Sequence, residues 1–269
     1  MRLRPFVPGD YPAIAAWVCG PDELRAFAGD RLTWPLTEHE FLDLIDAPGR
    51  TAWTTITGDD PGTPIGHVQL TRTEAGTRIS RLIVDPAHRG AGHGRALLDH
   101  AIRRAHPATP IRLSVLAENT IALGLYVRTG FVPTGRDEDI LHLTKAARRS
   151  PNSSAIEQFD ELAEAMSWLG ARRAHMMGRP MLSIDGRMLA CLDDGNLGLR
   201  LGRGTPRHSA ALSIAGAGPF APGDRGRAFH DWVALPVDAR SEWAAFTYDA
   251  LEHTRLLGPH NHSRRTERS

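Results

Sequence analysis

The sequence of 269 residues has only two cysteines and a single lysine, and it has no long apolar run. Cys19 and Cys191 cannot build the disulfide framework of a small secreted domain, and because both lie among apolar residues we expect buried, reduced thiols. No window reaches the ~18 apolar residues that indicate a membrane helix, and the N-terminus lacks the apolar core of a signal peptide. These absences predict a cytoplasmic protein with no membrane partner.

A strong net charge is also absent. The chain has 32 basic and 31 acidic residues, a formal charge of +1, and neither half departs from balance. A balanced surface gives no general electrostatic attraction to nucleic acid or to anionic membranes. The remaining composition, with 41% hydrophobic and 23% charged residues, is typical of globular domains with a buried core.

One polar stretch divides the chain. Residues 145–158, KAARRSPNSSAIEQ, contain a proline and several serines without hydrophobic periodicity, which indicates a linker. The C-terminal end is polar and aperiodic as well. The sequence therefore predicts a first domain over residues 1–146, a linker over 147–156, a second domain over 157–256 and a disordered tail over 257–269.

Apolar periodicity and turn residues predict an α/β first domain in which strands alternate with helices. The expected strands cover residues 2–6, 51–57, 64–71, 77–84, 111–116 and 141–144. The expected helices cover 10–18, 37–45, 92–105 and 119–129, with a capping box formed by Thr37 and Glu40. This order implies a mixed sheet flanked by helices, with at least one parallel crossover.

The second domain is expected to be a smaller α+β unit with an antiparallel sheet. A helix over 157–169 ends at Gly170, and strand-like runs follow at 180–184, 187–192 and 197–201. The dipeptides Asp185-Gly186 and Asp194-Gly195 between these runs predict tight hairpins. A helix over 241–256 closes the domain.

The segment that carries chemistry is a glycine-rich turn after the strand that ends at Val84. Asp85-Pro86 ends the strand, and residues 89–95, RGAGHGR, lead into a helix. Glycines allow backbone N–H groups to close on an anion at the positive end of a helix. A P-loop would need Gly-Lys and then Ser or Thr, and a dinucleotide fingerprint would need G-x-G-x-x-G. Both are missing, and a turn without a ligand stays an alternative.

A third pattern fits the turn. Val84-Asp85-Pro86 followed by Arg89-x-x-Gly92-x-Gly94 resembles the coenzyme A pyrophosphate loop of the GCN5-related N-acetyltransferases (GNAT), and of RimI-like members in particular. Further along, N-x-x-A-x-x-x-Y-x-x-x-G-F over residues 119–131 is similar to the motif that closes the cofactor site in this family. With both motifs in the family's order, residues 1–145 are identified as a member.

The resemblance implies a GNAT-type mixed sheet with acetyl-CoA as cosubstrate and no metal. In this family the pantetheine arm lies between two splayed strands, here residues 77–84 and 111–116. The residues implied to contact the cosubstrate are Leu82, Ile83, Val84, Arg89, Gly90, Ala91, Gly92, His93, Gly94, Arg95, Asn119 and Tyr126. Asn119 can alternatively serve only as a helix cap, and His93 stands where the family usually has an apolar residue.

The implied reaction is direct acetyl transfer to a primary amine of a small molecule or protein, the chemistry of an acyl-CoA-dependent N-acyltransferase. Tyr126 matches the general acid of many members, although it can alternatively only shape the pocket, and a backbone N–H at Val84 matches the oxyanion donor. The glutamate base of RimI-like enzymes is replaced by Ser114. His67, Glu118 or a water chain are the remaining candidates for the base.

The acceptor in this family binds near the N-terminal helical segment, here residues 21–48. This segment has more carboxylates than arginines, which suits either a cationic amine or a solvated surface.

The second domain resembles, more weakly, the N-terminal domain of TfoX-like proteins. The similarity rests on the segments MMGRP (176–180), DGRMLA (185–190), LRL (199–201), PF (219–220) and WVALP (232–236). Met177 departs from the usual phenylalanine. These are turn glycines and core residues, so they indicate a fold rather than an activity.

A function of another class stays open, namely a non-catalytic acyl-CoA-binding sensor whose output comes through the TfoX-like domain. The serine at position 114 favours the sensor, whereas Tyr126 favours an enzyme. Nucleic-acid binding by the second domain fits poorly with its balanced charge. The sequence leaves open which amine is the acceptor and whether the protein is a monomer or a homodimer.

Overall fold

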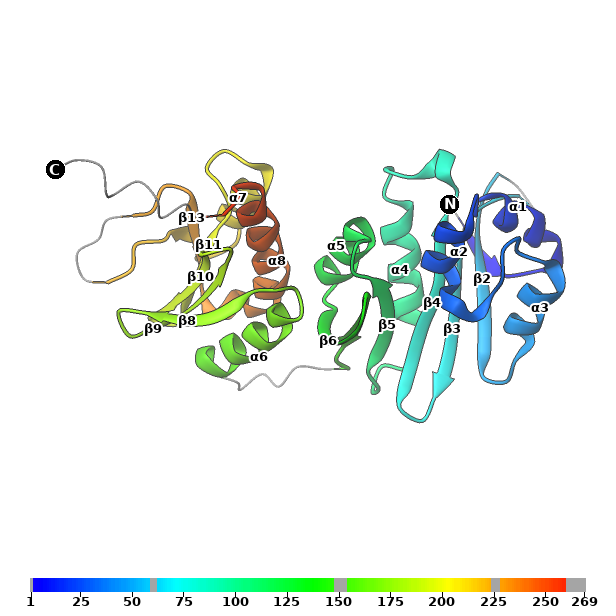
Figure 1. The fold of residues 1–269 in the computed structure, drawn as a ribbon, viewed down its shortest axis with the longest axis horizontal. Helices are drawn as coiled ribbons and strands as arrows, with labels where there is room; N and C mark the ends of the chain where they lie inside the picture. The colour runs from blue at the N-terminus through cyan, green and yellow to red at the C-terminus, as the bar shows by residue number, and fades with distance from the viewer. Residues whose placement is uncertain (1, 59–61, 148–153, 224–227, 260–269) are drawn as a thin grey trace. The chain divides into compact units, whose positions relative to one another are not determined.

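The computed structural model describes residues 2–58, 62–147, 154–223 and 228–259 (Figure 1). The chain divides into two compact units, one formed by residues 1–125 with 136–149 and the other by 126–135 with 150–269. The predicted domains differ from these units at 126–135. The predicted linker lies largely outside the described residues, as does the tail from residue 260, so the predicted boundaries stay a prediction.

The first sheet has seven strands in the order β1-β2-β3-β4-β5-β7-β6, and all of them except most of β6 belong to the first unit. Its strands are β1 (Arg2–Pro5), β2 (Arg50–Thr57), β3 (Thr63–Thr73), β4 (Gly76–Val84), β5 (Ile111–Leu116), β6 (Val132–Asp137) and β7 (Ile140–Lys145). The β4–β5 pair is parallel, and the pairs β1–β2, β2–β3, β3–β4 and β5–β7 are antiparallel. The predicted mixed sheet with a parallel crossover is confirmed.

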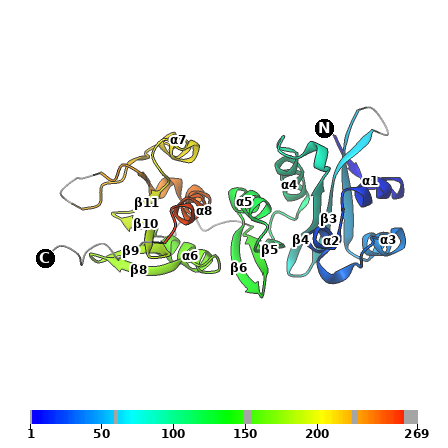
Figure 2. The ribbon, with the colours of Figure 1, turned by 45° about the horizontal axis from the view of Figure 1, so that its top comes forward.

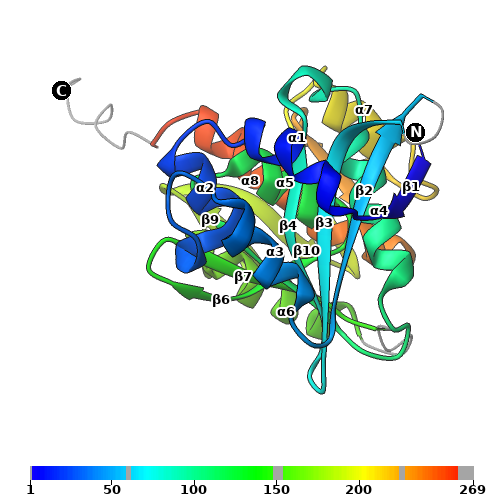
Figure 3. The same ribbon diagram turned by 90° about the vertical axis from the view of Figure 1, so that its right-hand side faces the viewer.

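Helices cover both faces of this sheet. α1 (Tyr11–Ala16), α2 (Pro21–Ala28) and α3 (Glu38–Asp46) lie over one face, and α4 (His93–Arg104) lies over the other (Figures 1 and 3). Under α1–α3 a core forms around Ile14, Trp17, Phe27 and Phe41, which are all buried. α5 (Thr120–Arg128) follows β5 along the chain.

Local signals at the helix starts are borne out in part. Thr37 caps α3 by accepting from the backbone N–H of Glu40, but the Glu40 carboxylate accepts from the Thr37 hydroxyl rather than from its backbone. Asp10 precedes α1 without capping it. Its carboxylate instead accepts two bonds of 2.7 Å from Arg4 and one of 2.8 Å from Thr54.

The second unit contains a six-stranded sheet with the order β12-β13-β11-β10-β9-β8, and its pairs are antiparallel. The strands are β8 (Arg172–Met176), β9 (Arg179–Ile184), β10 (Arg187–Asp193), β11 (Asn196–Arg200), β12 (Gly218–Pro219) and β13 (Trp232–Leu235). Its helices are α6 (Ala155–Ser167), α7 (Pro206–Leu212) and α8 (Arg240–Leu256). α8 packs on β10 and β11 beside α6 and α7 (Figure 2). The predicted smaller α+β unit is confirmed.

Two-residue turns connect the four consecutive strands β8, β9, β10 and β11. Asp185-Gly186 and Asp194-Gly195 have positive φ at both positions, as the sequence predicts. Met177-Gly178 makes a third turn of the same kind, with φ of 50° and 80°. Met177 is 89% exposed at its tip, so the side chain at this position is free of packing requirements.

No helix among the described residues is long and apolar enough to cross a membrane. The part of the chain that the structure covers also has no group of three or more His, Cys, Asp or Glu side chains arranged to hold a metal ion. Cys191 is buried, as expected, but Cys19 is exposed, so the prediction of a buried thiol is wrong there.

Candidate active site

The centre of the first sheet opens between β4 and β5. These parallel strands pair only at Thr77 with Ile111 and at Arg78 with Arg112. Beyond this point β5 continues its pairing with β7 through Leu116, and β4 continues its pairing with β3 through Val84. The facing edges of the two strands are therefore unpaired over the residues that the sequence assigns to the cosubstrate.

A bulge in β4 marks the place where the strands part. The register with β3 shifts between His67 and Gln69, and Arg81 within the bulge has a φ of 50°. After the bulge, the N–H of Asp85 donates to the carbonyl of Ile65 on β3 at 2.9 Å. Backbone groups alternate in direction along a strand, so the N–H and C=O of Val84 point toward the open edge.

The glycine-rich turn follows directly. Gly90 and Gly92 have φ of 79° and 84°, a conformation that favours glycine. A Cβ atom on either residue would meet no neighbour within 4 Å, so the backbone angle, not lack of space, requires glycine. α4 begins at His93 without a side-chain cap. Within the described structure, no protein acceptor pairs with the backbone N–H groups of residues 90–95, which leaves an anion-binding helix start.

The charged and aromatic side chains of the turn are partly engaged. Arg89 donates from Nε to the carbonyl of Val84 at 3.1 Å, which closes the turn against β4. Arg95 pairs with Asp99 at 3.4 Å across one turn of α4. The His93 ring lies 6.1 Å from the ring of His88. Their roles toward a cosubstrate stay predictions.

Asn119 begins α5 as a cap. Its Oδ1 accepts from the N–H of Ala122 at 3.1 Å, and its own N–H donates to the carbonyl of Leu116. The capping role that the sequence allowed is thus present. The side-chain amide nitrogen is not used by this cap, so a contact to a cosubstrate stays a prediction.

Tyr126 lies near the C-terminal end of α5. Its ring is buried and packs edge-on against Phe131, with ring centroids 6.1 Å apart. Burial raises the pKa of the Tyr126 phenol to about 12. The group therefore stays protonated over the whole physiological pH range and can act as a proton donor.

A directional chain of hydrogen bonds surrounds Ser114 on β5. Arg78 donates to its Oγ at 2.8 Å, and Oγ lies 3.0 Å from Nδ1 of His142 on β7. Nε2 of His142 lies 2.8 Å from Oδ2 of Asp137 on β6. With the Nε2–H tautomer, Ser114 donates to His142 and His142 donates to Asp137. The chain can carry a proton from Ser114 to His142.

Sequence reasoning missed His142 and Asp137. The alternation of β7 gives a partial signal, because Leu141 and Leu143 are buried and His142 must face the other way. The register that sets Ser114 opposite His142 joins two strands separated by α5 and β6. Such a non-local pairing is not visible in the sequence.

The two candidate bases from the sequence lie in different environments. His67 has 0% exposure and is surrounded by the rings of Phe6, Phe27 and Phe41 at 5.5–6.5 Å. Burial, with repulsion from Arg81, lowers the pKa of His67 to about 3. Such a ring is a poor proton acceptor at neutral pH, so His67 is not assigned as the base at the opening between β4 and β5. Glu118 is exposed just before α5, and its role as a base stays a prediction.

Comparison with known proteins decides the family. The family model described as acetyltransferase (GNAT) matches residues 21–131. Peptidyl-lysine N-acetyltransferase YjaB of Salmonella typhimurium is 34% identical over 125 residues, which cover 46% of this chain and 78% of the relative. This chain belongs to the GNAT family. The Escherichia coli YjaB protein is also 34% identical, with 46% of this chain and 77% of the relative covered.

Membership confirms the predicted enzyme class, an acyl-CoA-dependent N-acyltransferase. Among solved structures, the spermidine N-acetyltransferase of Vibrio cholerae in complex with CoA and spermine is 23% identical, with a TM-score of 0.42 over 53% of this chain and 93% of that one. The PaiA N-acetyltransferase of Thermoplasma acidophilum in complex with coenzyme A is 16% identical, with a TM-score of 0.44 over 54% and 98%.

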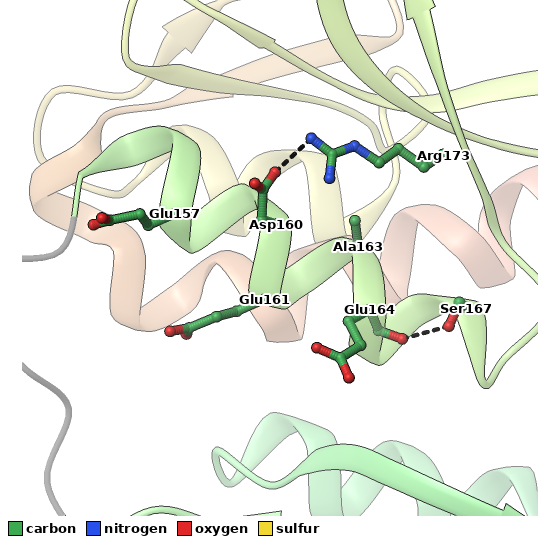
Figure 4. A pocket seen from close by; sticks show the side chains of 7 residues that line it. All are labelled: Glu157, Asp160, Glu161, Ala163, Glu164, Ser167 and Arg173. Atoms are coloured by element: carbon green, nitrogen blue, oxygen red, sulfur yellow. Dashed lines mark hydrogen bonds and ion pairs between the residues drawn. The ribbon is translucent and has the colours of Figure 1, made fainter.

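The second unit has a hollow along α6 that is rich in carboxylates (Figure 4). Asp160 pairs with Arg173 at 2.6 Å, and the Ser167 hydroxyl donates to the carbonyl of Glu164 at 2.6 Å (Figure 4). Glu157 belongs to a capping box with Ser154 at the start of α6. These contacts account for much of the hollow as ordinary helix surface.

Proposed function

We propose that this GNAT protein transfers an acetyl group from acetyl-CoA to a primary amine, using the opening between β4 and β5. The observation that carries the proposal is the unpaired edge of β4 leading into a turn whose N–H groups have no protein acceptor among the described residues. When bound, acetyl-CoA supplies a thioester whose carbonyl carbon is open to attack by an amine.

The residues present fit this cosubstrate. The N–H groups of residues 90–95 would hold the pyrophosphate at the start of α4. Backbone groups of Leu82 and Val84 would pair with the pantetheine amides along the open edge, whereas the same alternation turns those of Ile83 toward β3. The N–H of Val84, which points toward that edge, would stabilise the developing negative charge on the thioester oxygen.

Proton movement is assigned to two groups. Ser114 would accept the proton of the attacking amine as its own hydroxyl proton passes to Nδ1 of His142, with Asp137 holding the ring in the required tautomer. Tyr126 would donate its phenolic proton toward the departing thiolate. The role of Tyr126 rests on its match to the family motif, and its raised pKa keeps the proton available.

Release of free thiol from acetyl-CoA in the presence of an amine panel tests the proposal. The wild-type protein should release thiol only when an acceptor amine is added. The Tyr126→Phe variant should lose ~10²–10⁴-fold in kcat with acetyl-CoA affinity unchanged, because the phenol acts only on the leaving group. A protein that binds acetyl-CoA but releases no thiol with any amine would be a sensor of the alternative class.

The second unit carries no assigned activity. Its resemblance to the TfoX N-terminal domain stays a prediction about fold, and a homodimer stays untested. The relatives are named for acetylation of peptidyl-lysine, so a lysine side chain of a protein is one acceptor class to include in the panel.

A further inference from the structure

Four arginines gather on the face of the first sheet opposite α4. Arg81 lies in the β4 bulge and is only 7% exposed, and electrostatic repulsion reaches it from Arg50, Arg31 and Arg78. Gln69 beside Arg81 donates to the carbonyl of Leu44 in α3, and so does Arg50. These contacts place the group, here called the arginine cluster, on the α3 face.

No carboxylate among the described residues pairs with the arginine cluster. Arg81 donates from Nη1 to Oε1 of Gln69 and to Oγ of Ser80, both neutral groups. Its Nε is buried and has no hydrogen-bond partner among the described residues. In the same described part of the chain, none of the four arginines forms an ion pair with a carboxylate.

Without a bound anion, this buried and unpaired guanidinium lowers the stability of the folded protein. Burial, followed by repulsion from the other three arginines, lowers the pKa of Arg81 to about 10. A buried cation without a paired anion is strongly disfavoured. An anionic group of a bound ligand would supply the missing partner.

The nearby acidic segment does not supply that anion. Arg25 pairs with Asp139 at 2.6 Å and with Asp30 at 3.3 Å. Glu40 accepts from the hydroxyls of Thr37 and Thr33 at the start of α3. Glu23 accepts from the backbone N–H of Cys19, and Asp43 lies 3.3 Å from His39, so four of the seven carboxylates of residues 21–48 are engaged by groups of the protein.

The cluster adjoins the proposed reaction site. Arg81 immediately precedes Leu82 and lies three residues before Val84, and the backbone groups of both face the opening. Arg78 of the cluster donates to Ser114, the first group of the proton relay. The turn and α4 cover the other face of the sheet, so an amine that reaches the opening from the α3 face meets the arginines.

We propose that the acceptor amine carries a carboxylate, which binds to the arginine cluster at Arg81, with support from the exposed Arg31 and from Arg50. A guanidinium edge with parallel N–H donors matches a carboxylate in shape and charge. This inference rests on the proposed transferase function and names its substrate class. A polyamine, which brings only positive charge, would be repelled.

Matched amine pairs test the inference. Thiol release is measured with the L-amino acids, each against its own carboxamide, and with spermidine and O-phosphoethanolamine. In the wild type, kcat/KM for the preferred carboxylate should exceed that of its carboxamide by about tenfold or more. In Arg81→Gln this ratio should fall toward one, with Arg81→Lys in between.

Controls separate a lost contact from a lost fold. Arg72→Gln changes an exposed arginine of β3 outside the cluster and should leave the ratio unchanged. Arg31→Gln changes an exposed member, so it should stay folded and lower the ratio a few-fold. Calorimetric titration of acetyl-CoA into each variant should give the wild-type affinity.

The outcomes distinguish the inference from its basis. While acetyl-CoA still binds, any of four results would overturn the inference. Two concern the wild type with carboxylates: rates equal to those of the carboxamides, or no turnover of any carboxylated amine. The others are a preference for spermidine or O-phosphoethanolamine, and a ratio unchanged by both Arg81→Gln and Arg31→Gln. Failure of the folded wild type to bind acetyl-CoA would instead overturn the proposed function, and the inference with it.

Discussion

Replacing His67 with leucine should remove an acid-sensitive contribution to the stability of the first sheet. His67 is fully buried among aromatic rings, and neither of its ring nitrogens has a hydrogen-bond partner in the described structure. Its folded-state pKa is lowered to about 3, chiefly by burial and further by Arg81, while Asp10 acts weakly in the opposite direction.

The sign follows from proton uptake. In the unfolded chain His67 takes up a proton below about pH 6.5, whereas in the folded protein it stays neutral down to about pH 3. The unfolded state is therefore favoured increasingly as the pH falls through this window. At about pH 4.5 the loss in the free energy of unfolding amounts to about 3 kcal/mol, and near neutral pH it vanishes.

Urea titrations at about pH 7.5 and pH 4.5 measure this loss, with unfolding of the first sheet followed by hydrogen exchange of the peptide that contains β3. The difference between the two pH values should be smaller by about 3 kcal/mol in His67→Leu than in the wild type. His39→Leu is the control, because His39 is exposed on α3. An equal acid loss in His67→Leu and wild type would refute the assignment of a neutral, buried ring.

Three further outcomes are expected. Since burial raises the pKa of Tyr126 to about 12, kcat should show no alkaline loss from its ionisation below about pH 11, and a loss abolished in Tyr126→Phe would contradict this. His142→Gln should lower kcat/KM by roughly a hundredfold, measured by thiol release at neutral pH, and an unchanged value would exclude the relay. Gly198→Ala should destabilise the second sheet by about 1–3 kcal/mol in urea, because its Cβ would lie 2.4 Å from the ring of Phe220; Gly218→Ala, with open space, is the matched control.

Much of the fold could be predicted because its signals are local. The Asp-Gly dipeptides specify turns with positive φ whatever the rest of the chain does, and the observed hairpins follow them. Alternation and periodicity similarly gave β3, β4, α4 and α8 within a few residues. The glycine-rich turn could be recognised because the positive φ of Gly90 and Gly92 requires glycine, and this requirement is visible in the sequence.

Two of the strands that were not predicted, β6 and β8, have contradictory local signals. β6, VPTGRD, contains a proline and a glycine, which are disfavoured in strands. β8, RRAHM, is mostly polar and lies next to β9 at the end of the second sheet order. Both become strands because their neighbours offer backbone partners, a tertiary effect that overrides propensity.

Only the part of the site that is contiguous in the sequence could be predicted. Residues 82–95 are contiguous, so one motif located them together. The proton relay through Ser114 and His142 depends on a register between distant strands. Arginine is usually exposed, so the sequence gives no sign that Arg81 is buried. Its burial follows from the bulge, which turns a strand residue into the α3 face beside Gln69.

Calorimetric titration of acetyl-CoA into the intact protein and into Gly92→Glu tests the central claim most directly. Gly195→Glu is the matched control, because Gly195 has a similar positive φ with equally open space but lies in a hairpin of the second sheet. The account predicts binding to the wild type and Gly195→Glu, and binding weaker by roughly a hundredfold in Gly92→Glu, where a carboxylate faces the pyrophosphate site. A folded wild type without binding, or equal binding by all three, would contradict it.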